Sequence, residues 1–158
     1  MRKRILSETK FKAATKTAFD GSGIHTHSGD EIALHFQLLQ KKKGQIQFGF
    51  VGGMEKAIAT LDFEKGLATL NTSDWTAPQP QGKASFKLTP RDTHILRIEK
   101  TEGNGNWVKM ANIRVILDDK LILGVDNINV LPELGVTLKT QETKVLLKRF
   151  IHRGTPSG

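Results

Sequence analysis

The chain alternates apolar and polar residues over short stretches, with turn-forming residues about every ten positions. Residues 31–39 show the pattern clearly, because Ile32, Leu34, Phe36 and Leu38 are separated by Ala33, His35 and Gln37. A period of two places alternate side chains on opposite faces of a strand. The sequence therefore predicts about ten strands, at 31–39, 45–51, 57–63, 67–70, 84–88, 94–100, 112–117, 121–125, 134–140 and 144–151.

Three turn segments indicate which of these strands are neighbours along the chain. Lys41–Gly44 is expected to join strands 31–39 and 45–51 as a hairpin, Glu64–Gly66 to join 57–63 and 67–70, and Asp118–Lys120 to join 112–117 and 121–125. Residues 7–19 are ambiguous, since Ser7 suits a helix cap while the alternation of Phe11, Thr15 and Phe19 favours a strand. We interpret this stretch as a strand.

This many short antiparallel strands cannot form one flat sheet. They predict an all-β fold of two packed antiparallel sheets, a β-sandwich or jelly roll, with the alternating apolar faces buried between the sheets. A large sandwich usually bends, so an outer sheet face is expected to form a shallow binding groove.

The length of 158 residues fits one domain. We expect a single sandwich domain with its core at about 7–152, a basic N-terminal arm at 1–6 and a flexible tail at 154–158. No Cys is present, which excludes disulfides and thiolate-based metal or catalytic sites. No apolar run is long enough to span a membrane.

The chain carries a net charge of +8 that is unevenly distributed. Cations cluster near the N-terminus, at Lys41–Lys43 and near the C-terminus, and such a surface attracts polyanions or serves solubility. Basic Met1–Arg4 lacks the apolar stretch that a signal peptide needs, so the chain is either cytoplasmic or a domain of a larger exported protein. The linker-like tail favours export, periplasmic or extracellular, from a larger parent chain.

Residues 92–154 follow an order of strands, loops and turns known from other proteins: a strand after Thr93-His94, the acidic turn Asp118-Asp119-Lys120 with its return strand, then Gly135-Val136-Thr137-Leu138 and a last strand. Together with the strands at 31–39 and 45–51, this order resembles concanavalin A-like lectin/glucanase sandwiches over roughly 23–152. It is most similar to the laminin-G-like and 3-keto-disaccharide-hydrolase-like domains of bacterial carbohydrate-active proteins. The resemblance implies a sandwich fold and carbohydrate binding.

The chain also departs from that family. Thr93-His94 stands where the family has Trp, and Asp119 stands where a hairpin Gly with positive φ is expected. The Glu-x-Asp-x-x-Glu strand of the glucanases is absent, as is the Tyr that the lyase branch requires, because the chain contains no Tyr. The resemblance therefore supports the fold more than an activity.

The segment His25-Thr26-His27 is the first candidate for chemistry. On a strand, His25 and His27 point the same way, and Asp30 follows closely. Such a set of side chains has three interpretations. It contacts a ligand, it binds a divalent metal, or it lies solvated on a surface strand.

Polar side chains on the outward strand positions are the second candidate. The positions opposite the core hold His35 and Gln37, Gln45 and Gln47, Arg97 and Glu99, and finally Arg114 and Lys139. Of these, we expect the following to contact ligand: His35, Gln37, Gln47, Arg97 and Arg114. Amides and guanidinium groups pair with sugar hydroxyls or with acidic groups on a glycan. An outer sheet face must also be polar for solubility alone.

Two further features have both a structural and a functional interpretation. Trp75, in a loop with two prolines, is either a stacking platform for a sugar ring or a plug over the core, and the apolar neighbours of Trp107 favour the core. Many laminin-G-like sandwiches bind a calcium ion, so we consider a calcium site near Asp118, Asp119 or Asp126. Two adjacent aspartates supply too few oxygens for calcium, so no cofactor is expected.

Three functions remain open from the sequence. The first is a carbohydrate-binding module for an oligosaccharide or polysaccharide that includes acidic ones, within or beside a bacterial glycan-active protein. The second is a glycoside hydrolase or lyase that uses His25, His27 or His35. The third is a basic polyanion- or protein-interaction domain; nucleic acid is disfavoured because no aromatics interleave the basic runs.

Overall fold

The structure, a computed structural model, describes residues 2–6, 18–20, 30–39, 43–52, 55–73, 79–103, 110–129, 135–143 and 145–154. In these residues the regular elements are all strands, and they form two six-stranded antiparallel sheets. They contain no helix long and apolar enough to cross a membrane.

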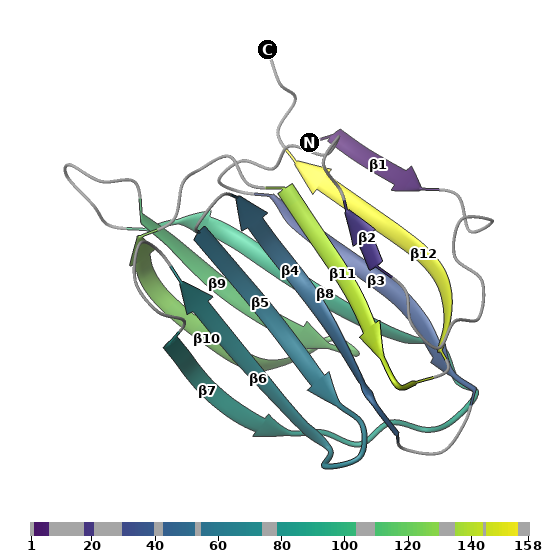
Figure 1. Cartoon of the computed structure of the whole chain (residues 1–158). Coiled ribbons are helices and arrows are strands. Elements are labelled where there is room, and N and C mark those ends of the chain that lie inside the picture. The colour runs from purple at the N-terminus through teal and green to yellow at the C-terminus, as the bar shows by residue number, and fades with distance from the viewer. Residues whose placement is uncertain are drawn as a thin grey trace.

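Sheet A has the strand order β1-β12-β3-β8-β9-β10 (Figure 1). Its strands are β1 (Arg2–Leu6), β12 (Val145–Gly154), β3 (Glu31–Leu38), β8 (His94–Glu102), β9 (Met110–Leu117) and β10 (Lys120–Asn129). Sheet B has the order β2-β11-β4-β5-β6-β7, with β2 (Ala18–Asp20), β11 (Gly135–Gln141), β4 (Gln45–Gly52), β5 (Glu55–Asp62), β6 (Leu67–Ser73) and β7 (Gln79–Ser85).

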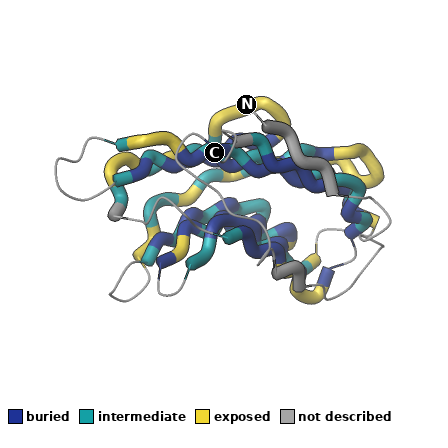
Figure 2. Tube along the Cα trace, turned by 90° about the horizontal axis from the view of Figure 1, so that it is seen from above, coloured by how far each residue is buried: buried dark blue, intermediate teal, exposed yellow. Residues whose placement is uncertain are grey.

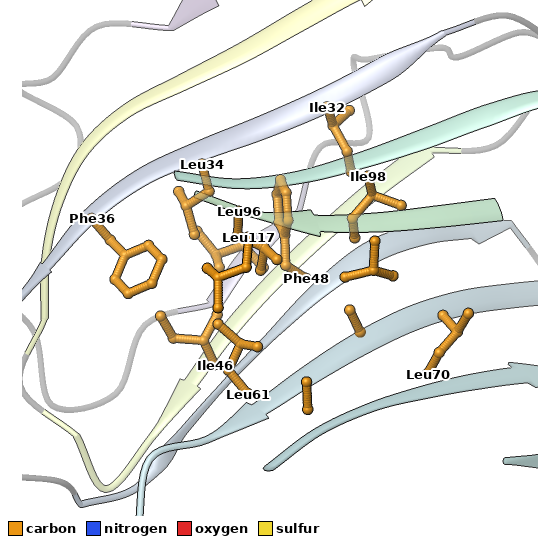
Figure 3. Close-up of a cluster of buried hydrophobic side chains, with 14 of the residues drawn as sticks. Ile32, Leu34, Phe36, Ile46, Phe48, Leu61, Leu70, Leu96, Ile98 and Leu117 are labelled. Atoms are coloured by element: carbon orange, nitrogen blue, oxygen red, sulfur yellow. The ribbon is translucent and has the colours of Figure 1, made fainter. Parts of the chain in front are cut away.

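The two sheets bury their apolar faces against each other. Seen from above, they form two layers with buried positions along both (Figure 2). Phe36 and Leu34 of β3 meet Phe48 and Ile46 of β4 in this core, and all four side chains are fully buried (Figure 3). The predicted all-β, two-sheet sandwich is confirmed, and so is the direction in which the alternating residues point.

Two of the three predicted hairpins are correct. β5 and β6 pair across the turn at residues 63–66, and β9 and β10 pair across Asp118-Asp119. Asp118 and Asp119 have φ of 50° and 65°, so both adopt the left-handed conformation that a two-residue hairpin turn requires. Asp119 thus occupies the expected positive-φ position without being Gly.

The predicted hairpin between residues 31–39 and 45–51 is wrong. β3 pairs with β12 and β8 in sheet A, whereas β4 pairs with β11 and β5 in sheet B. The chain crosses from one sheet to the other between these strands. Alternation shows which side of a strand faces the core, but it does not show to which sheet the strand belongs.

The chain ends differ from the expected layout in one respect. Residues 2–6, expected as an arm outside the core, form the edge strand β1 beside β12. Of the stretch 7–19 that we interpreted as a strand, residues 18–19 belong to β2, and residues 7–17 lie outside the described residues, as does most of the tail. The strand expected at 84–88 is β7, which ends at Ser85.

Candidate functional site

The two outer faces of the sandwich carry the polar side chains, and they differ in how those side chains are partnered. The predicted site residues are divided between these faces. His35, Gln37, Arg97 and Arg114 lie on sheet A, whereas Gln47 lies on sheet B. The expectation that they line one groove is wrong, because β3 and β4 belong to opposite layers.

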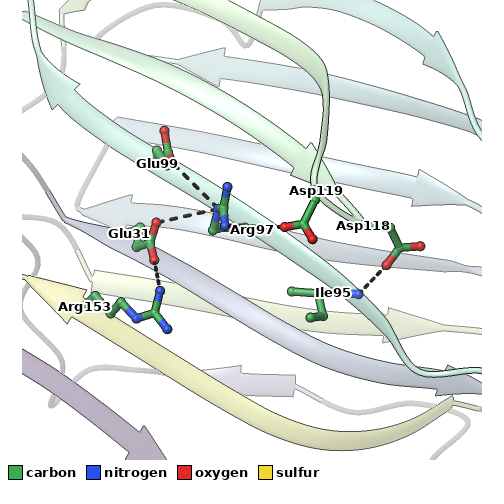
Figure 4. A network of polar contacts seen from close by, with 7 residues as sticks. All are labelled: Glu31, Ile95, Arg97, Glu99, Asp118, Asp119 and Arg153. Atoms are coloured by element: carbon green, nitrogen blue, oxygen red, sulfur yellow. Dashed lines mark hydrogen bonds and ion pairs between the residues drawn. The ribbon is translucent and has the colours of Figure 1, made fainter.

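On the outer face of sheet A, Arg97 lies among carboxylates (Figure 4). Its Nε is 3.7 Å from Glu31 Oε2 and 3.6 Å from Glu99 Oε1, and its Nη1 is 3.8 Å from Asp119 Oδ1. The Nε atom is buried and makes no hydrogen bond. Three acids thus offset this one guanidinium, and Arg97 holds strands together rather than presenting a free cation.

Two further arginines of this face are paired in a similar way. Arg153 Nη1 donates to Glu31 Oε1 at 2.9 Å, and Arg114 Nη2 donates to Asp126 Oδ1 at 2.6 Å. Arg114 Nη1 also donates to the Ile113 carbonyl. Arg114 therefore braces β9 against β10, which gives it a structural explanation that the sequence could not provide.

The two other predicted residues on sheet A are also engaged. Gln37 Nε2 donates to Thr93 Oγ1 at 3.4 Å, and His35 has a partner of its own. His25, His27, Trp75 and Trp107 lie outside the described residues. Convergence of the three histidines therefore stays a prediction.

The outer face of sheet B presents a different surface, which we call the sheet-B face. Its side chains come from alternate positions of five adjacent strands, and most are half-buried or exposed. They are Gln45, Gln47 and Val51 of β4, Lys56, Ile58, Thr60 and Asp62 of β5, Leu67, Thr69, Asn71 and Ser73 of β6, Lys83 and Ser85 of β7, and Thr137, Lys139 and Gln141 of β11.

Strand register aligns part of this face into one row. Lys139 pairs with Gln47, Gln47 with Thr60, Thr60 with Thr69, and Thr69 with Lys83, so the row crosses β11, β4, β5, β6 and β7. Neighbouring strands lie about 4.8 Å apart, so the row spans about 19 Å. This is long enough for an extended oligomer.

The middle of the sheet-B face has polar groups without partners. In the part of the chain that the structure describes, the side chains of Gln47, Thr60, Thr69 and Asn71 make no hydrogen bond to another residue. In the next row of side chains, where Gln141 of β11 pairs with Gln45 of β4, Gln45 Nε2 donates to Gln141 Oε1 at 2.9 Å. The free amide and hydroxyl groups are thus concentrated on β4, β5 and β6.

Gly49 leaves a gap in the side-chain layer beside this row. It lies on β4 between Thr137 of β11 and Ile58 of β5. A Cβ atom there would be 2.2 Å from the Ala57 carbonyl oxygen, so the close approach of β4 and β5 requires glycine. Gly49 itself is buried, and the half-buried Ile58 lies beside it, between Gly49 and Asn71.

The aspartates considered as calcium ligands already have partners within the protein. Asp118 Oδ1 accepts from Ile95 N at 2.9 Å and its Oδ2 lies 2.7 Å from His94 Nδ1, while Asp126 pairs with Arg114. Asp119 faces Arg97. Among the described residues, no group of three or more acids and histidines is placed to hold a metal ion.

Comparison with known proteins shows the fold but not the family. No model of a known protein family matches the chain, and no curated protein sequence matches it. Among solved structures, a protein of unknown function with a galectin-like fold from Bacillus subtilis has a TM-score of 0.69 at 8% identity, over 96% of this chain and 88% of that one.

The names of two further similar structures mention a carbohydrate ligand or carbohydrate binding. The carbohydrate-binding module CBM66 from Bacillus subtilis has a TM-score of 0.63 at 12% identity, over 91% of each chain. A toad ovary galectin in complex with thio-digalactose has a TM-score of 0.61 at 11% identity, over 89% of this chain and all of that one (100%). The chain therefore has a galectin-like β-sandwich fold, within the predicted concanavalin A-like class.

Sequence reasoning missed Thr60, Thr69, Asn71, Lys56 and Lys83. Thr60 and Thr69 occupy outward positions of predicted strands, so the signal was present for these two, whereas Lys56, Asn71 and Lys83 lie just beyond the predicted strand ends. It became specific only once β4, β5, β6 and β7 were known to be neighbours in one sheet.

Proposed function

We propose that this protein binds carbohydrate through the sheet-B face. The observation that carries the proposal is the row of polar side chains from Lys139 to Lys83, whose central amide and hydroxyl groups have no partner among the described residues. On sheet A, by contrast, the arginines are already paired with carboxylates.

The chemistry of this row suits a sugar. A carboxamide offers donors and an acceptor in one plane, and a hydroxyl offers both, so Gln47, Asn71, Thr60 and Thr69 match neighbouring sugar hydroxyl groups. The half-buried Ile58, between Gly49 and Asn71, provides an apolar surface for the C–H face of a ring. An oligosaccharide lying across the strands would meet all of these groups.

Trp75 is assigned to the same site in this proposal. It lies between Ser73, the last residue of β6, and Gln79, the first residue of β7, so its loop joins two strands of sheet B. An indole ring offers a broad surface for a pyranose. We assign the stacking role to Trp75 on this position in the chain.

The charge of the face favours an acidic glycan. Lys56, Lys83 and Lys139 are exposed on it, and Asp62 is the carboxylate among the positions named above on β4, β5, β6, β7 and β11, a balance of 3 − 1 = +2 for those five strands. The Asp62 Oδ1 atom is already used, since it accepts from Lys65 N at 3.0 Å. Uronic acid or sulfate groups at the ends of the ligand would meet Lys83 and Lys139.

The similar structures support a sugar-binding role at the level of the fold, since they include a carbohydrate-binding module and a galectin with a bound galactoside analogue. The same proposal includes three narrower statements. They are a relationship to laminin-G-like or 3-keto-disaccharide-hydrolase-like domains, a larger exported parent chain, and a bacterial glycan as ligand.

Two matched glutamines test the proposal. Gln47 and Gln37 are both half-buried and point outward, but from opposite sheets. After a glycan array has identified an oligosaccharide, calorimetry compares Gln47→Ala and Gln37→Ala. Losing one sugar hydrogen bond costs about 1 kcal/mol, or about fivefold in affinity, and we expect this loss only for Gln47→Ala.

The double variant Gln47→Ala/Asn71→Ala is expected to lose about 25-fold if the two contacts are independent. Loss of affinity in Gln37→Ala or His35→Ala, with Gln47→Ala unchanged, would assign the ligand to sheet A and refute the proposal. Binding of none of the glycans would refute sugar recognition itself.

A further inference from the structure

A separate cavity lies at the edge of the sandwich, beside the end of the sheet-B face at Ser85. It has a volume of about 450 Å³ and is lined by Ser85, Phe86 and Lys87 at the end of β7 and by Leu117, Asp118, Lys120 and Ile122 of β9, β10 and their turn. β7 and β10 are edge strands of opposite sheets and contact each other (Figure 1). The volume falls within the range of small-ligand sites.

The inner part of this cavity is apolar and held in place by the core. Phe86 packs edge-on against Phe63, with ring centroids 6.3 Å apart, and its backbone N donates to the Gly66 carbonyl at 3.0 Å. Leu117 is buried, and Ile122 packs against the core. These three side chains present a fixed apolar surface to a ligand.

The rim of the cavity is cationic. Lys87 and Lys120 are exposed there, and in the described part of the chain neither ammonium group has an ion-pair or hydrogen-bond partner. Asp118 is the acid in the lining, but both its oxygens are engaged, by Ile95 N and by His94 Nδ1. His94 is fixed in turn, because its Nε2 donates to the Thr89 carbonyl at 2.8 Å.

From this arrangement we infer that the cavity binds a small amphiphilic carboxylate. The apolar body of the ligand would lie on Phe86, Leu117 and Ile122, and its carboxylate would lie between Lys87 and Lys120. The two lysines outnumber Asp118, the single acid of the lining, whose oxygens are already in contact with Ile95 N and His94 Nδ1. The rim therefore keeps an excess of positive charge, which an anionic head group would offset. The inference is independent of the sugar proposal, because that proposal rests on the row from Lys139 to Lys83, none of whose residues lines the cavity.

The test titrates the full chain with sodium decanoate, with decan-1-ol as an uncharged probe of the same length, and with 2-naphthoate as an aromatic carboxylate. All probes are used below the concentrations at which they aggregate. We expect saturable binding of at least one carboxylate, with its affinity at least tenfold above that of the alcohol. Decanoate and 2-naphthoate distinguish a straight-chain ligand from an aromatic one.

Variants locate the binding. Lys87→Ala/Lys120→Ala should weaken the bound carboxylate at least tenfold and leave the alcohol unchanged, whereas Ile122→Ser should weaken both. Lys148→Ala is the matched control, because Lys148 lies on β12, which β3, β8 and β9 separate from β10, and it should change neither. Circular dichroism and the urea midpoint verify that each variant is folded.

The inference is overturned if neither carboxylate binds saturably, if alcohol and carboxylates bind alike, or if the double lysine variant retains full affinity. A loss caused equally by Lys148→Ala would also overturn it, since that result reflects general attraction to a basic protein. These outcomes leave the sugar proposal untouched, because that proposal is measured with Gln47 and Gln37 variants.

Discussion

His152 Nε2 lies 2.8 Å from Asp30 Oδ2, and this contact joins the start of β3 to the end of β12 across 122 positions of sequence. Asp30 is almost completely buried, at 1% exposure. Its backbone oxygen also accepts from Lys100 N at 2.9 Å, so this one residue connects β3 with both of its neighbours in sheet A.

We therefore expect Asp30→Ala to destabilise the fold strongly. Removing the Asp30 carboxylate leaves the buried His152 Nε2 without this hydrogen-bond partner, which costs about 1–3 kcal/mol. Urea unfolding measures the change. Asp126→Ala is the control, because its pair with Arg114 is largely exposed and should cost no more than about 1 kcal/mol. Similar losses in both variants would show that the Asp30 pair is not an anchor of sheet A.

The variant Phe48→Ala tests which side chains of β4 point into the core. Phe48 is fully buried and packs edge-on against Phe150, with ring centroids 6.0 Å apart. Deleting such a ring costs about 3–5 kcal/mol in a core. Leu121→Ala provides the comparison, since Leu121 is 58% exposed and should change stability by no more than about 0.5 kcal/mol. A loss below about 1 kcal/mol for Phe48→Ala would mean that the inner and outer faces are exchanged.

Gly49 provides a test of strand spacing in sheet B. In Gly49→Ala the new Cβ would meet the Ala57 carbonyl oxygen of the paired strand, so β4 and β5 must separate, at a cost of about 1–3 kcal/mol. Gly124→Ala is the comparison, because its nearest atoms, Arg114 Cδ and Nη1, lie at 3.0 and 3.1 Å from the new Cβ and need to shift by only a few tenths of an ångström. Thermal unfolding of both variants measures the difference, and an equally small shift in the two would contradict the close approach at Gly49.

The three exposed lysines of the sheet-B face predict a salt effect. Affinity for a uronic-acid-containing oligosaccharide should fall as ionic strength rises, because exposed charge pairs are screened over about 10 Å at 0.1 M salt. A neutral oligosaccharide of the same length should show no such fall. Calorimetry at low and high salt checks this, with Lys83→Ala/Lys139→Ala expected to flatten the dependence. Equal salt dependence for both sugars would remove the case for an acidic ligand.

The layers of the fold could be predicted from the sequence because burial repeats with a period of two. Ile46, Phe48 and Phe50 all face the core as expected, and the Asp118-Asp119 turn has the expected positive φ. The assignment of strands to sheets could not be predicted in this way. β3 and β4 are consecutive, yet they lie in different sheets: β3 pairs with β12 and β8, whereas β4 pairs with β11 and β5.

The candidate site was predictable only in part for the same reason. Gln47 was identified correctly as an outward residue, but Arg97 and Arg114 have the same outward pattern and are paired with acids from other strands. Pairing of this kind depends on which strands are adjacent in space. Lys83 illustrates the converse, because its place opposite Thr69 follows from the β6–β7 register rather than from its own sequence context.

The location of the sugar site is tested most directly by mapping backbone amide chemical shifts during titration with an oligosaccharide that binds. If the sheet-B face is the site, the largest shifts will fall on the outward positions of β4, β5 and β6, with Gln47, Thr60 and Asn71 among them. Residues of β3, β8 and β9 would then remain nearly unchanged. Shifts concentrated at His35, Gln37 and Arg97 instead would contradict the assignment and place the ligand on sheet A.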